Sequence, residues 1–152
     1  MFADLDAVER EVEHLLAVGY DKAGNWDLAQ ICGHLGKWLR FPMDGFPKAP
    51  APIRAMLWLL RVTIGRKKLR EYLTTGQMKT GTPTLKESVP APKGDEAAAV
   101  SLFKTTLGRA KTYTGVLQPS PLFGQLTREE WVKLNLVHAA HHLSFLVPKS
   151  SH

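Results

Sequence analysis

REEWVKLNLVHAAHHLSFL, residues 128–146, is the stretch that decides both the fold class and the candidate site. Thr127 and Glu130 have the spacing of a capping box, which predicts the start of a helix. We expect this helix to span the whole stretch and to end before Pro148, because proline cannot continue a helix. The chain therefore ends in a helix of about five turns.

Two histidines of this helix are candidates for a metal site. His138 and His142 are four residues apart, so they lie one turn apart on one helix face. Trp131, Leu134 and Phe145 fall on that same face, which directs the pair into the interior. Considered alone, such a pair is more often explained by packing and by hydrogen bonds to the backbone. A third inward histidine shifts the balance towards a metal ion.

That third histidine lies in an earlier helix, within GNWDLAQICGHL, residues 24–35. Asn25 can cap this helix, which we expect to continue to Phe41 and to end at Pro42. On the helical wheel His34 falls among apolar positions, so its ring points towards the interior. Three inward histidines from two helices make a facial set of ligands.

The remaining histidines and the nearest carboxylates receive other interpretations. His14 and His152 are expected in solvent, and His141 at the rim of the site. Asp27 and Glu130 are better explained as acidic groups at helix N-termini than as general bases. No catalytic acid or base is assigned.

The rest of the chain also has helical patterns and no alternating stretch that would predict a strand. Further helices are expected from Leu5 to Gly19, from Pro52 to Leu73 with a bend at Gly65, and from Asp95 to Ala110. Irregular connections are expected at residues 42–52, 74–94 and 118–126, and the longest of them should fold over one end of the helices. The predicted fold is all-α: a four-helix bundle with long crossover connections and one extra short helix.

The composition fits one soluble domain, predicted at residues 1–148 with a short tail at 149–152. The net charge is +6, but the basic run at residues 66–70 lacks interleaved aromatic residues, so a nucleic-acid partner is not expected. The start of the sequence has no secretory signal pattern and Cys32 is the single cysteine, which favours a cytoplasmic location. No apolar run is long enough for a transmembrane helix, and no membrane partner is expected.

Two motifs resemble those of the DinB-like superfamily. Trp26, Gln30 and His34 match its W-x-x-x-Q-x-x-x-H helix, and HAAHHLSFL, residues 138–146, resembles its second signature. The preceding SPLFGQLTREEW is similar to an uncharacterised subfamily, domain of unknown function 1569. The resemblance implies the four-helix DinB-like fold and a divalent metal ion, zinc or nickel, held by His34, His138 and His142. Leu143, Ser144 and Phe145 stand where many relatives have Arg, Gly and Gln.

The resemblance implies a metal-dependent enzyme that acts on a small molecule, either a transferase that uses a low-molecular-weight thiol or a hydrolase. Peptidase activity is not expected, because Ala139 stands where the H-E-x-x-H motif has its general base. The alternative is a non-catalytic binding or stress-response module with a structural metal. A site that faces a cleft favours the enzyme, and a sealed apolar site favours the module.

One helix segment lacks a polar face. Residues 56–60 read MLWLL and are apolar around the whole helix, whereas a bundle covers only one broad face. We therefore expect this segment to contribute to a homodimer interface, unless the connection at residues 74–94 covers it.

Overall fold

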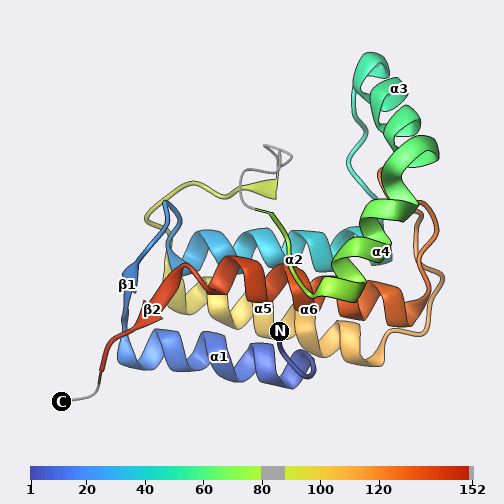
Figure 1. Cartoon of the computed structure of the whole chain (residues 1–152). Helices are drawn as coiled ribbons and strands as arrows, with labels where there is room; N and C mark the ends of the chain where they lie inside the picture. Colours follow the sequence, from blue (N-terminus) through green and yellow to red (C-terminus); the bar gives the residue numbers. More distant parts are fainter. Residues whose placement is uncertain (80–87, 151–152) are drawn as a thin grey trace.

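The computed structural model of the chain describes residues 1–79 and 88–150, and most of them are helical. Four of the helices lie side by side (Figure 1) and are called the helical body: α1 (Leu5–Val18), α2 (Leu28–Asp44), α5 (Glu96–Thr112) and α6 (Arg128–Leu143). Two others, α3 (Ala51–Leu60) and α4 (Arg66–Thr75), are joined by the π-helix Arg61–Gly65. The predicted predominance of helix is confirmed.

The core of the helical body is built from the apolar stripes that the sequence predicts. Leu5, Val8, Val12 and Leu15 of α1 are buried, and their spacing of three and four residues places them on one face. Trp131 of α6 is the largest fully buried side chain. Because buried apolar area is the main source of stability, these side chains hold the helices that carry the candidate site.

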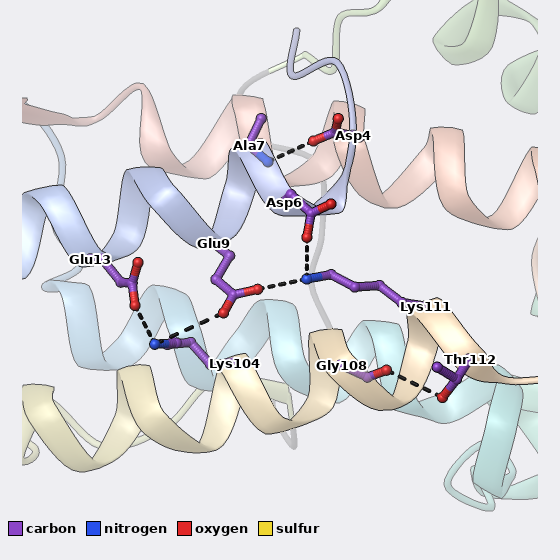
Figure 2. A network of polar contacts seen from close by, with 9 residues as sticks. All are labelled: Asp4, Asp6, Ala7, Glu9, Glu13, Lys104, Gly108, Lys111 and Thr112. Carbon is purple, nitrogen blue, oxygen red and sulfur yellow. Dashed lines mark hydrogen bonds and ion pairs between the residues drawn. The ribbon is translucent and has the colours of Figure 1, made fainter.

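Ion pairs cross the surface between α1 and α5, as Figure 2 shows. Lys104 lies between Glu9 and Glu13, and Lys111 contacts Asp6 at 2.5 Å and Glu9 at 2.6 Å. Surface ion pairs of this kind contribute little to stability. They orient α1 on α5, while the apolar contacts beneath them hold the two helices together.

A short antiparallel sheet joins the end of α1 to the end of α6, and the expectation that the chain has no strand is wrong. β1 (Tyr20–Lys22) pairs with β2 (Leu146–Pro148). Each strand has three residues, which is too short for an alternating pattern to appear in the sequence. α6 ends at Leu143, and Leu146, the predicted last residue of this helix, belongs to β2 instead. The helix is therefore shorter than predicted.

The predicted end of α2 is also wrong, because the helix continues past Pro42 to Asp44. Pro42 lies in the last turn, where its missing N–H costs one hydrogen bond and the helix has few bonds left to lose. The N–H of Gly45 closes that turn by donating to the carbonyl of Phe41 at 2.8 Å. The longer α2 carries the chain farther along the helical body before it turns towards α3.

α3 and the π-helix project away from the helical body (Figure 1), and we call residues 51–64 the arm. None of the arm residues is buried. Gly65 lies at the bend predicted for it, and α4 returns to pack against α6. The apolar segment 56–60 is thus without cover in the described structure, and the homodimer stays a prediction.

Residues 80–87 of the expected connection and residues 151–152, which include His152, lie outside the described residues. Among the described residues, no helix is long and apolar enough to cross a membrane.

Candidate metal centre

The structure brings the three predicted histidines together from two helices. His34 is on α2, and His138 and His142 are on α6. The Nε2 atom of His138 lies 3.0 Å from Nε2 of His34 and 3.0 Å from Nε2 of His142. One nitrogen from each ring lies within 4.8 Å of the others, so the three rings could hold one metal ion.

Burial keeps all three imidazoles neutral. It lowers the pKa of His34 to about 4 and the pKa of His142 to about 3. The pKa of His138 falls well below its ordinary value, first because the ring is buried and then because the other two histidines lie beside it. A neutral imidazole offers a nitrogen lone pair, which is the form that binds a metal. At neutral pH no proton has to leave the site before an ion enters.

The contacts among the three Nε2 atoms also fit a cation. His138 has two Nε2 neighbours at hydrogen-bond distance, but a neutral imidazole carries a single N–H. A single Nε2 atom has either one N–H or one lone pair, so it cannot satisfy both contacts by hydrogen bonds, whereas a cation between the rings would satisfy all three nitrogens. A tetrahedral ion with bonds of about 2.0–2.1 Å places its nitrogen ligands about 3.3 Å apart, close to the two 3.0 Å contacts.

Two tryptophans pack against the histidines. The Trp26 ring stacks on His142 with centroids 5.1 Å apart and an interplanar angle of 9°. It meets the ring of His34 edge-on at 5.0 Å. Trp38, one turn after His34 on α2, contacts the rings of His34 and His138 edge-on at 6.3 and 6.2 Å. The tryptophans restrict the ring orientations and exclude water from one side of the site.

Ser88 fixes the protonation of His34, and the sequence analysis missed this residue. The Nδ1 atom of His34 lies 3.3 Å from the carbonyl oxygen of Ser88 and 3.2 Å from its hydroxyl oxygen. Because a carbonyl only accepts, the proton of His34 belongs on Nδ1, and Nε2 is left as a free ligand atom. Partners of this kind orient metal-binding histidines.

The motif residue Gln30 holds the Ser88 segment on α2. Asp27, rather than the predicted Asn25, caps the helix: its carboxylate accepts from the Gln30 N–H at 2.8 Å. The Gln30 side chain accepts from the N–H of Asp27 at 3.2 Å and donates to the carbonyl of Pro90 at 3.2 Å. Gly33 allows this approach, because a Cβ there would lie 2.4 Å from Cγ of Pro90.

The histidines form part of the wall of a cavity of about 550 Å³ that is neither sealed nor flat. Most of its lining is apolar or aromatic, and it includes Trp38, Phe46, Phe123 and Leu134. No Asp or Glu side chain of the described residues lines it. A ligand in this cavity would therefore meet mostly apolar walls, the histidine nitrogens and a few other polar side chains, among them Lys79, Ser120 and Asn135.

The model of the family described as Protein of unknown function (DUF1569) matches residues 1–149. The chain belongs to this family. The part of the sequence analysis that named this family is confirmed. Comparisons with the curated proteins and with the solved structures gave no match.

In this member of the DUF1569 family four other residues of the sequence analysis take the positions expected of them. His14 is exposed, and His141 lies at the cavity with its ring 5.0 Å from that of His142. Asp27 and Glu130 both belong to capping boxes, which supports their interpretation as helix N-terminal charges. Burial raises the pKa of Cys32 to about 12, so this thiol is not a thiolate ligand at neutral pH.

The sequence alone indicates that Trp38 lies beside His34. Trp38 follows His34 by four residues on α2, and that spacing alone places the two rings on one face. Ser88 lies in a segment without a helical or strand period, so no pattern in the sequence connects it to His34.

The stability of the metal-free protein is expected to fall as the pH is lowered from 7 to 5. The folded state holds the pKa of His34 at about 4, below its ordinary 6.5, so in this interval the unfolded chain binds a proton that the folded chain excludes. His34 alone should cost about 2 kcal/mol of unfolding free energy between these two pH values. Urea unfolding with a chelator present measures the change.

A His34→Asn variant is the control for this pH dependence: it removes one of the three buried histidines, so its loss of stability between pH 7 and pH 5 should be about 2 kcal/mol smaller than that of the natural protein. The paired carboxylates Asp6 and Glu71 interfere little, because their ordinary pKa values of 3.8 and 4.5 are lowered further in the fold. Equal stability of the natural protein at pH 7 and pH 5 would contradict the neutral, buried state of the histidine.

Proposed function

We propose that this protein is a metal-dependent enzyme with the DinB-like four-helix fold, and that His34, His138 and His142 hold one divalent ion, zinc or nickel. The observation that carries the proposal is the convergence of three neutral Nε2 atoms at the wall of an open cavity. Sites with three protein ligands are typical of catalytic rather than structural metals, because a coordination position stays open for a reactant.

The chemistry follows from the kind of ligands. Three neutral imidazoles add no negative charge, so a bound ion would keep its full positive charge. That charge would act on whatever reactant occupies the open coordination position. When bound there, a divalent ion acts as a Lewis acid and lowers the pKa of a coordinated thiol or water, which makes it a nucleophile at neutral pH. We propose a thiol-dependent transferase or a hydrolase that acts on a small molecule.

The chain's own residues have positioning roles in this proposal. Ser88 keeps the Nδ1 proton on His34, while Trp26 and Trp38 hold the rings and keep bulk water away. The apolar cavity would take the apolar part of a substrate. With no carboxylate among the described lining residues, the proposal assigns no general base and does not favour peptidase chemistry.

The openness of the cavity favours the enzyme over a non-catalytic module. A structural metal is normally enclosed by four protein ligands, whereas this site offers three and adjoins about 550 Å³ of space. A small thiol or another anion would have room to reach the ion.

Cobalt substitution tests the proposal. Protein loaded with Co²⁺ should bind one ion and should develop a sulfur-to-cobalt absorption band when a small thiol is added. Metal-dependent turnover of an electrophile by the thiol would support the transferase, and turnover of an ester without thiol would support the hydrolase. A bound ion whose spectrum does not respond to thiols, together with no turnover of either kind, would favour the non-catalytic module.

A further inference from the structure

The arm, residues 51–64, gathers the exposed apolar side chains of the molecule. The described residues include eleven large hydrophobic side chains that are exposed, and six of them belong to the arm. These six are Ile53, Met56, Trp58, Leu59, Val62 and Ile64, and Trp58 is 62% exposed. Contiguous apolar patches on a soluble protein usually mark a surface that contacts a partner or a membrane.

The charges of the arm and of the segments next to it in the sequence are of one sign. From Gly45 to Arg70 the sequence contains seven Lys and Arg residues and no Asp or Glu, while the rest of the chain contains 13 basic and 14 acidic residues. The whole positive excess of the protein is thus concentrated at the arm and at its base. Arg54 and Arg61 take part in no ion pair among the described residues.

The arrangement of these charges on the helix is regular. Arg54 and Arg61 are seven residues apart, so they lie on one face of the arm, with apolar side chains around the rest of it. At its base, Arg66 and Lys68 are held by Glu130 and Glu71, whereas Lys67 and Arg70 are exposed. Cations therefore lie on the arm and on α4 at its base, next to an apolar projection.

We propose that the arm inserts into the interfacial region of a membrane that contains anionic lipids. Apolar side chains and a tryptophan would enter the boundary between headgroups and acyl chains, and the cations would contact lipid phosphates and carboxylates. α3 has ten residues, about 15 Å of helix, which suits an interfacial contact and not a span. The sequence analysis expected no membrane partner because no apolar run is long enough to span a bilayer.

Charge argues against a second copy of the chain as the occupant. An isologous interface between two arms would bring two segments of high positive charge together with no acidic residue from either to compensate them. The homodimer expected from the sequence is therefore the alternative to membrane binding, and the experiment below distinguishes the two.

Vesicle co-sedimentation of the whole protein tests the proposal. The protein should bind vesicles of phosphatidylcholine with about 30% phosphatidylserine at least tenfold more tightly than vesicles of phosphatidylcholine alone, and added salt should weaken the binding. Leu59→Asp should reduce binding at least about tenfold, because it places a charge in the apolar part of the arm. Leu102→Asp is the matched control: Leu102 is 61% exposed on α5, away from the arm, and its replacement should leave binding unchanged.

Both substituted positions are exposed, so both variants should fold, and circular dichroism checks this. Three results would overturn the proposal: no binding to the anionic vesicles, equal loss of binding in the two variants, or a dimer in light scattering that Leu59→Asp dissociates. None of these results bears on the metal site.

Discussion

His138→Ala is expected to abolish the binding of a divalent ion. His138 supplies the central nitrogen of the site, since its Nε2 atom lies 3.0 Å from both of the other Nε2 atoms. Without it, the two remaining nitrogens belong to different helices and offer an ion only two ligands. Removal of a residue that merely orients a ligand costs about 10- to 100-fold in affinity, so loss of a ligand should exceed 100-fold.

His141→Ala is the matched control for this experiment. The two histidines are neighbours on α6, and His141 lines the same cavity but belongs to no group of three possible ligands among the described residues. Elemental analysis after zinc loading and dialysis should give about one ion for each chain in His141→Ala and close to none in His138→Ala. Equal metal content in the two variants would refute the metal centre.

The parts of the site that the sequence could predict are those set by helical spacing. His138 and His142 lie on one face because they are four residues apart, and His34 faces inward because apolar residues surround it on the wheel. Their convergence on one point depends on how α2 packs against α6, which no local pattern determines. The family resemblance supplied that step.

The parts that could not be predicted depend on long-range contacts. Ser88 reaches His34 only because Pro90 packs over Gly33 and accepts a hydrogen bond from Gln30. The two strands form because the ends of α1 and α6 meet, and three residues carry too little pattern to indicate this. The helix α2 continues for two residues past Pro42, because a proline in the last turn of a helix disrupts few of its hydrogen bonds.

Gly65 shows a similar dependence on a distant segment, and Gly65→Ala is expected to lower the free energy of unfolding by about 3 kcal/mol. A Cβ at this position would lie 2.1 Å from the carbonyl oxygen of Leu122, and backbone cannot rotate away as a side chain can. The turn that contains Leu122 is itself closed by two backbone hydrogen bonds between Ser120 and Gly124, of 2.8 and 2.9 Å. The π-helix or this turn must therefore shift.

Gly108→Ala makes the same chemical change in a helix where it should stabilise the protein. Nothing lies within 4 Å of a Cβ at Gly108, so alanine there gains helix propensity, about 0.5–1 kcal/mol, without a clash. Urea unfolding at neutral pH should move the two variants in opposite directions. Because Leu122 also lines the cavity, the shift in Gly65→Ala should in addition weaken the binding of ligands next to the histidines. If Gly65→Ala were as stable as Gly108→Ala, the close packing of the base of the arm on this turn would be wrong.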